Sequence, residues 1–431
     1  MNLESKMKIF KKIQSCRICF STKLKHVLDL SNQPPANSLK KKINEKSNEI
    51  PLNLVFCKSC KTVQLEETVK PKYLFSNYIW VTGTSNKIKT YSKYFSSNVI
   101  KRYKGKNKKI LEVASNDGTV LSEFKKKNFM CLGIDPAKNL AKLANQNGVK
   151  TLSKFFDYKS SVKIKKKYGA QGIIFARNVI PHVENIHSVV KGISNLLDEN
   201  DNSIVVIEFH NSTTILNELH YDSIYHEHIF FFSIKTITNI FKKYGLYSFD
   251  IFKSPISGGS WVLFFSKRKN KKTSNLLKLE NLEKIKKINQ ISKWQNFSKN
   301  SIIHSKNLKF IVNNINKKLN KKIIAYGASA RSSTMLNFSN LNNKDIKFII
   351  DKNKMKNNKF TPGTNIKVIS LSKALPLIKK EKYLLILAWN FKEEIVKSLK
   401  KSGFNGKFII PLPKKISIKL FLKKIKSKVF F

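Results

Sequence analysis

The chain has 431 residues and is 41% hydrophobic, which is enough for two or three domains that each bury a core. Its formal charge of +56 would suit nucleic-acid binding, but only five basic residues are arginine, the side chain that best reads bases and phosphates: Arg17, Arg102, Arg177, Arg268 and Arg331. Because the lysines are spread along the chain, we expect solvated faces and no specific nucleic-acid partner, although the charge could steer an anionic substrate.

Neither terminus predicts a membrane span. Residues 1–13 are charged and lack the apolar stretch of a signal peptide, and no run of 18 apolar residues occurs anywhere in the sequence. The basic, apolar tail, residues 414–431, permits two interpretations: an interfacial helix on a membrane, or a terminal helix packed on its own domain. Together these features fit a cytoplasmic protein.

Residues 1–70 carry two C-x-x-C pairs, Cys16 with Cys19 and Cys57 with Cys60. Each pair can offer two thiolates to one tetrahedral ion, and four soft ligands suit zinc. The alternatives are two redox pairs or four free thiols. Because a four-thiolate zinc site has no open position, we expect the ion to be structural and to hold a small N-terminal module together.

Residues 71–266 alternate between strand-like apolar runs and segments with helical periodicity. A helix over 87–103 leads into this pattern. Strands are expected at 110–114, 130–134, 172–176, 203–209 and 261–266, and helices at 120–127, 138–145 and 234–244. This alternation predicts an α/β domain with a parallel or mostly parallel sheet.

The segment Leu111-Glu-Val-Ala-Ser-Asn-Asp-Gly118 ends the first of these strands, at the edge where α/β sheets bind nucleotide-like ligands. Asp135 ends the second strand, where an acid commonly holds ribose hydroxyls. The alternatives are an ordinary turn with a capping aspartate, or an NAD site, which the absence of Gly-x-Gly-x-x-Gly disfavours. We expect an S-adenosylmethionine (SAM) site that includes Glu112, Ala114, Asn116, Gly118, Asp135 and Asn178.

Two later segments also carry polar side chains suited to a site. Asn178 and His182 follow a strand and would point toward the same carboxyl edge, although such a pair can also cap a helix. The segment Tyr225-His-Glu-His228 brings a phenol, a carboxylate and two imidazoles together, and a glutamate can orient a histidine that acts as a base. We expect a catalytic base here. The alternatives are a metal site, for which the HExxH spacing is missing, and structural packing.

The segment Gly258-Gly-Ser260 precedes the last strand of this domain and suits either a substrate loop or a hairpin turn. Residues 267–316 have helical periodicity and predict a connecting helix.

Residues 317–431 form a second α/β pattern, with strands expected at 322–326, 348–351, 383–388 and 407–410 and a helix at 330–337. The strand-turn-helix at its start would offer free N–H groups and Arg331 to an anion such as a diphosphate. We expect Tyr326, Gly327 and Arg331 to contact substrate.

In this order, the motifs resemble the sugar C-methyltransferases of deoxysugar biosynthesis, which methylate C3 of nucleotide-linked 4-keto sugars. The likeness spans almost the whole chain. It includes the cysteine module, residues 111–118, the block 225–228 with its following Phe-Ser, and the C-terminal segments 325–328, 350–353, 361–364 and 387–391. Two positions depart from the family pattern: Ser257 stands where members often carry His, and Ala114 where Gly is frequent.

The resemblance implies a zinc module (1–70), a central class I SAM-dependent methyltransferase domain (71–266), a helical connector (267–316) and a C-terminal Rossmann-like domain that helps to hold the sugar nucleotide (317–431). It implies that His228 removes the proton next to the ketone, and that Tyr225 and Glu227 orient this base and hold the sugar. Tyr78 and His182 match active-site residues of the family.

Two other functions stay open at this point. The first is SAM-dependent methylation of another acceptor, such as a sugar oxygen or a small metabolite, which would not need an acidic carbon. The second is a nucleic-acid-binding zinc-ribbon protein with a vestigial methyltransferase fold, which the charge and the cysteine pairs suggest and the scarcity of arginine disfavours.

Overall fold

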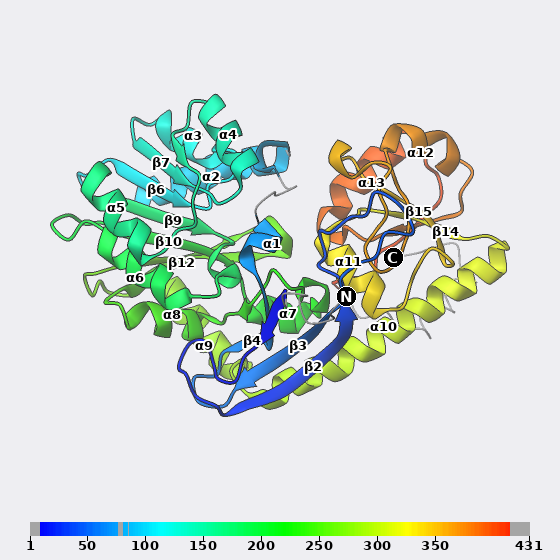
Figure 1. Cartoon of the computed structure of the whole chain (residues 1–431), viewed down its shortest axis with the longest axis horizontal. Helices are drawn as coiled ribbons and strands as arrows, with labels where there is room; N and C mark the ends of the chain where they lie inside the picture. Colours follow the sequence, from blue (N-terminus) through cyan, green and yellow to red (C-terminus); the bar gives the residue numbers. More distant parts are fainter. Residues whose placement is uncertain (1–8, 76–80, 85, 414–431) are drawn as a thin grey trace, which may run out of the picture.

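The computed structural model describes residues 9–75, 81–84 and 86–413. Tyr78 and the tail 414–431 therefore lie outside the described residues. Two α/β bodies lie side by side, and the long helix α10 and the N-terminal strands β2 and β3 run beneath them (Figure 1). Within the described part of the chain, no helix has the length and apolar character needed to cross a membrane.

The N-terminal module is built on an antiparallel sheet of order β11-β4-β3-β2. Its strands are β2 (Leu24–Gln33), β3 (Ile50–Cys57), β4 (Val63–Leu65) and β11 (Phe230–Phe231), while β1 (Phe10–Lys12) pairs with β5 (Glu67–Val69) and α1 (Pro71–Phe75) follows. Strand β11 comes from the middle of the chain, two residues after His228. The expected catalytic segment is therefore tied directly to the N-terminal module.

The central body has a seven-stranded sheet of order β12-β13-β10-β9-β6-β7-β8. Its strands are β6 (Lys109–Val113), β7 (Met130–Ile134), β8 (Thr151–Leu152), β9 (Ile173–Arg177), β10 (Ile204–His210), β12 (Tyr247–Ser254) and β13 (Ser260–Ser266). The five adjacent strands β10, β9, β6, β7 and β8 run parallel, and β13 is antiparallel to both β10 and β12. The predicted mostly parallel sheet is confirmed, but the expectation omitted β8 and β12.

Helices cover both faces of this sheet because their apolar sides pack on its buried strands. They are α2 (Asn86–Arg102), α3 (Thr119–Lys125), α4 (Lys138–Gln146), α5 (Tyr158–Tyr168), α6 (Ile186–Leu196), α7 (Ser212–Glu218) and α8 (Ile234–Lys242). The rings of Phe95 in α2, Phe124 in α3 and Phe175 in β9 contact one another in the core on one face of the sheet. The carboxyl edge of the sheet is left for the site.

The expected single connecting helix is wrong, because two helices separated by a turn occupy this region: α9 (Ser274–Ile285) and α10 (Ile291–Leu319). Lys287 in the turn has a left-handed backbone (φ 54°), which stops the first helix. Helix α10 packs on β2, α7 and β14 and so contacts all three parts of the chain.

The second body has a wholly parallel five-stranded sheet of order β16-β15-β14-β17-β18. Its elements are β14 (Ile323–Tyr326), α11 (Ala330–Phe338), β15 (Ile346–Ile350), β16 (Val368–Ile369), α12 (Leu371–Ile378), β17 (Tyr383–Ile386), α13 (Lys392–Lys401) and β18 (Lys407–Ile409). The loop after β14 faces the carboxyl edge of the central sheet.

Candidate active site

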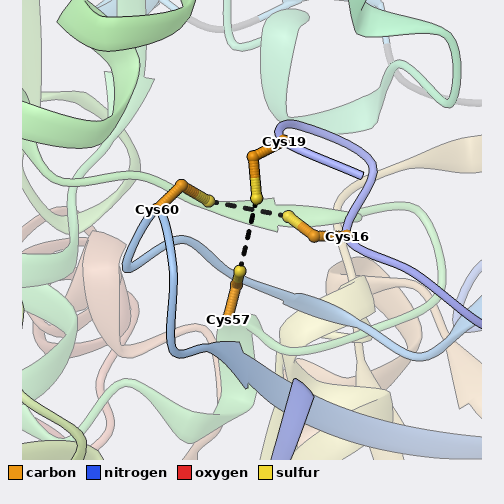
Figure 2. Close-up of side chains that lie close together, drawn as sticks. All are labelled: Cys16, Cys19, Cys57 and Cys60. Atoms are coloured by element: carbon orange, nitrogen blue, oxygen red, sulfur yellow. Dashed lines mark hydrogen bonds between the residues drawn. The ribbon is translucent and has the colours of Figure 1, made fainter. Parts of the chain in front are cut away.

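The two cysteine pairs meet at one end of the N-terminal sheet, as Figure 2 shows. All four sulfurs lie within 4.8 Å of one another, with 3.6 Å between Cys16 and Cys60 and 3.5 Å between Cys19 and Cys57. Sulfurs around a tetrahedral zinc with Zn–S bonds of about 2.3 Å lie roughly 3.8 Å apart, whereas a disulfide needs about 2 Å. The arrangement therefore fits a closed four-thiolate zinc site.

The cysteine centre also docks the N-terminal module on the central domain. His187 of α6 donates from Nε2 to the Ile18 carbonyl at 3.0 Å and accepts the Tyr244 hydroxyl at 2.7 Å. Phe20 stacks on the same imidazole, with ring centroids 5.0 Å apart. A folded zinc centre would thus fix where the module sits.

The loop after β6 brings backbone N–H groups to the edge of the sheet. Ala114 (φ 55°) and Asn116 (φ 53°) have left-handed backbones that turn the chain over the strand end. The carboxylate of Asp135 accepts the N–H groups of Asn116 and Ala137, each at 2.8 Å. Because each carboxylate oxygen keeps a further lone pair, Asp135 can hold the loop and still accept a ribose hydroxyl.

A cluster of ionisable side chains lies beneath this loop. Burial raises the pKa of Glu112 well above its ordinary value, and Arg177 opposes the shift. Arg177 is held by an ion pair to Glu208, with 2.8 Å between Nε and Oε2. Reasoning from the sequence missed the pair Arg177–Glu208. The sequence feature that could have revealed it is a single charged residue near the carboxyl end of each of two apolar strands.

Tyr225 and His228 form a hydrogen-bonded pair. His228 Nδ1–H donates to the Ser223 carbonyl at 2.7 Å, so its Nε2 carries the lone pair and accepts the Tyr225 hydroxyl at 2.6 Å. His182, which ends the turn η3 (Ile180–His182), lies edge-on to His228 with ring centroids 4.7 Å apart. Burial, assisted by His182, lowers the pKa of His228 well below its ordinary value. His228 is therefore neutral near pH 7, in the tautomer that can act as a base through Nε2.

The other two residues of the motif face the N-terminal module. Glu227 accepts the side-chain N–H of Asn37 at 2.6 Å, and His226 Nε2 lies 3.2 Å from the Pro51 carbonyl. A role for Glu227 in orienting the base stays a prediction. Among the described residues, the group of side chains that could hold a metal is the four cysteines, which does not support the metal alternative for the motif.

The C-terminal domain supplies the opposite wall. Helix α11 begins after Ser329, whose hydroxyl accepts the Ser332 N–H at 3.1 Å, and Arg331 lies in its first turn. Lys356 donates to the Ala328 carbonyl at 2.7 Å. This wall suits an anionic group, because it combines a helix N-terminus with an arginine and a lysine.

One cavity of about 630 Å³ joins these groups. Its lining includes the predicted SAM residues Glu112, Ala114, Asn116, Asp135 and Asn178, the predicted catalytic residues His182, Tyr225 and His228, and Arg331 with Lys356 on the far wall. The structure thus brings segments from the central and C-terminal domains to one cavity that His228 also lines.

Several predicted residues lie outside the lining of this cavity: Gly118, Glu227, Gly258, Gly259, Ser260, Tyr326 and Gly327. Tyr326 is buried in β14, and Gly258 lies in the hairpin turn between β12 and β13, against Trp389. Gly118 adopts a left-handed backbone before α3, where a side chain would strike Val149. The local structure gives Tyr326, Gly258 and Gly118 packing roles, and substrate contact by any of the seven residues stays a prediction.

Three family models match the chain in order: a zinc binding domain over residues 16–75, a methyltransferase domain over 89–248 and a C-methyltransferase C-terminal domain over 255–413. The C-methyltransferase NovU of Streptomyces niveus is 26% identical over 411 residues, which cover 94% of this chain and 97% of that protein. The chain is a SAM-dependent C-methyltransferase, similar to NovU over almost its whole length. Its central body is the class I methyltransferase fold.

Solved structures of other proteins also match part of this chain. The PH0226 protein of Pyrococcus horikoshii OT3 is 14% identical with a TM-score of 0.35, covering 46% of this chain and 97% of that one. The magnesium protoporphyrin IX methyltransferase ChlM of Synechocystis PCC 6803, solved with bound SAM, is 10% identical with a TM-score of 0.31, covering 41% and 78%.

SAM and zinc are therefore the cofactors of this C-methyltransferase. The residues present fit both groups. The four thiols match a tetrahedral ion, and the Asp135 loop offers a buried carboxylate with free lone pairs at the carboxyl edge of the sheet. When bound, SAM supplies an electrophilic methyl group.

Proposed function

We propose that this C-methyltransferase methylates C3, the carbon next to the ketone, of a nucleotide-linked 4-keto-deoxysugar. The observation that carries the proposal is the single cavity that runs from the Asp135 loop, past His228, to the wall that contains Arg331. A ketone acidifies the neighbouring C–H bond, so the reaction needs one base, one donor to the enolate oxygen and little water.

His228 and Tyr225 meet the first two needs. Nε2 of His228 takes the proton from C3, and the Ser223 carbonyl fixes the tautomer that allows this. Burial raises the pKa of Tyr225 well above its ordinary value, so its hydroxyl keeps a proton to donate. On substrate entry that hydroxyl turns from Nε2 to the ketone oxygen, which frees the base and stabilises the enolate.

The far wall holds the rest of the substrate. The N-terminus of α11, Arg331 and Lys356 all suit the diphosphate of a sugar nucleotide. This placement leaves the sugar between the diphosphate and the SAM loop, beside His228.

The test is mass spectrometry after incubation with SAM and a dTDP-4-keto-6-deoxyhexose. We expect a gain of one methyl group on the sugar, and a loss of about 10³-fold in turnover for His228→Ala, with SAM affinity unchanged by calorimetry. His26→Ala, which removes an imidazole of the N-terminal sheet, is the control and should keep full turnover.

Deuterium exchange at C3 without methyl transfer separates carbon from oxygen acceptors. We expect solvent deuterium to enter C3 in the wild type and not in His228→Ala. Wild-type turnover in His228→Ala would remove the assigned base. SAM binding without exchange or methylation would remove the keto-sugar substrate.

A further inference from the structure

The turn at residues 221–224, directly before Tyr225, is held by the C-terminal domain. The carboxylate of Asp222 accepts the indole N–H of Trp389 at 2.7 Å. The hydroxyl of Thr334, in α11, donates to the Ile224 carbonyl at 3.2 Å. Two of the four residues in this turn are therefore fixed by groups more than a hundred positions later in the chain.

The contact between Asp222 and Trp389 sits in a tightly packed group. The guanidinium of Arg331 lies 4.9 Å from the Trp389 ring centroid, and its Nε lies 3.6 Å from Asp222. The His220 ring packs on the same indole, with centroids 4.6 Å apart. A Cβ added to Gly258 would come within 3.0 Å of Trp389, so little room remains around the indole. Asp222 itself is fully buried, which makes the loss of a donor costly.

The same turn also makes a hydrogen bond to His228. Ser223, between Asp222 and Ile224, provides the carbonyl that accepts His228 Nδ1–H at 2.7 Å. If this carbonyl moved, Nδ1 would lose its acceptor and the proton could shift to Nε2, where it would block the base. The anchors on both sides of Ser223 therefore bear on the tautomer of His228.

We propose that Trp389 is a positioning residue: by holding Asp222 it fixes the Ser223 carbonyl and keeps His228 in the tautomer that can accept a proton at Nε2. The proposal deepens the proposed function and rests on the role given there to His228. It also assigns a role to the packing of the C-terminal domain on the central domain. Arg331, in the wall proposed to hold the anion, and Trp389 belong to one packed group around Asp222.

Trp389→Phe tests the proposal, because it removes the indole N–H and keeps an aromatic ring. Trp294→Phe is the matched control: that tryptophan is also buried, and its Nε1 donates to the Ile288 carbonyl at 3.1 Å in another part of the chain. For Trp389→Phe we expect roughly 10-fold lower kcat with an unchanged KM for SAM, since a misdirected base slows chemistry more than binding.

The second readout is ¹⁵N NMR of histidine-labelled full-length protein, in which the His228 signals are identified by their loss in His228→Ala. We expect the Nδ1–H tautomer in the wild type and in Trp294→Phe, and a mixture in Trp389→Phe. Thr334→Val, which breaks the neighbouring anchor, should shift the tautomer in the same direction to a smaller extent.

The proposal fails if Trp389→Phe keeps the wild-type tautomer, or if Trp294→Phe lowers kcat equally. The NMR measurement needs no substrate, so it tests the positioning role of Trp389 separately from the proposed substrate. If the wild type does not methylate the keto sugar but Trp389→Phe still alters the His228 tautomer, the proposed substrate is wrong and the positioning role of Trp389 stands.

Discussion

The loops after β6 and β14 have the same backbone design in two different domains. The first residue after each strand, Ala114 or Gly327, has a positive φ. Each donates its N–H to the last residue of the adjacent strand, Ile134 at 2.7 Å or Ile350 at 2.8 Å. Asp135 and its counterpart Asp351 each then accept two backbone N–H groups, at 2.8–2.9 Å.

The two loops differ in the charge beside the acid. Lys356 lies 3.3 Å from Asp351, whereas in the described part of the chain the groups shown to contact Asp135 are backbone N–H groups. The first loop therefore presents an uncompensated carboxylate, which suits ribose hydroxyls, and the second presents a neutralised acid and an arginine, which suits an anion. We therefore propose that the same backbone serves two ligands, because the side chains around its acid differ.

The largest effect on stability is expected at the second loop. In Gly327→Ala the new Cβ would lie 2.3 Å from Cβ of Ala388, at a residue with φ 98°. Overpacking and backbone strain together should lower the free energy of unfolding by on the order of 3 kcal/mol, measured by chemical denaturation. Gly245→Ala isolates the strain, since φ is 71° there and no atom lies within 4 Å, and should cost only about 1 kcal/mol. Equal losses in the two variants would show that the contact with Ala388 is unimportant.

The next largest effect is expected on SAM affinity, and it should differ between Asp135 and Asp351. Asp135→Asn should weaken SAM binding by about 10- to 100-fold, because a charged hydrogen bond to the ligand contributes about 1.5–3 kcal/mol. Asp351→Asn is the matched change in the other loop and should leave SAM affinity as it is. Calorimetry with SAM alone measures both. A similar loss in both variants would mean that the second loop also binds SAM.

The strands that frame these loops were predictable from sequence, because buried parallel strands are continuous apolar runs bounded by polar turns. Strands β6, β7, β9 and β10 lie within one residue of their expected ends. Strand β12 was missed: its residues, YSFDIFKS, mix charged and apolar side chains. Strand β8 was also missed, because it has only two residues. The split of the connector was also missed, because Lys287 gives no sequence signal for a left-handed backbone.

The site was predictable where its residues are neighbours in sequence. Tyr225 and His228 lie three residues apart and do form a pair. Partners that are distant in sequence were not predictable: Glu227 meets Asn37 across 190 residues, and Asp222 meets Trp389 across 167. Proximity in sequence also suggested that Glu227 acts on His228, which stays a prediction, and the structure adds the contact of its carboxylate with Asn37.

A smaller effect is expected for the lysine that distinguishes the two loops. Lys356→Met removes the charge beside Asp351 and should weaken binding of a nucleoside-diphosphate sugar by about 3- to 10-fold, with SAM affinity unchanged. Lys354→Met, an exposed change two residues away, is the control and should have little effect. Titration calorimetry with the sugar nucleotide gives both values. An unchanged affinity in Lys356→Met would place the anion elsewhere.

The smallest effect is expected at Ala114, the counterpart of Gly327. Its left-handed backbone costs an alanine roughly 1–2 kcal/mol, and a glycine avoids this cost but loses about 0.5–1 kcal/mol through the freedom of the unfolded chain. Ala114→Gly should therefore raise the free energy of unfolding by about 1 kcal/mol or less, measured by chemical denaturation, with SAM affinity unchanged. A loss of stability would show that the Ala114 methyl group contributes packing that outweighs the strain. A gain of stability in Ala114→Gly and a loss in Gly327→Ala would both follow from the left-handed backbone that the two positions share, so these two variants cannot measure the contact with Ala388. Gly245→Ala provides that measurement, because it has the backbone strain without the contact. The difference between Gly327→Ala and Gly245→Ala therefore identifies the contact with Ala388 as the feature that makes glycine necessary in the second loop and dispensable in the first.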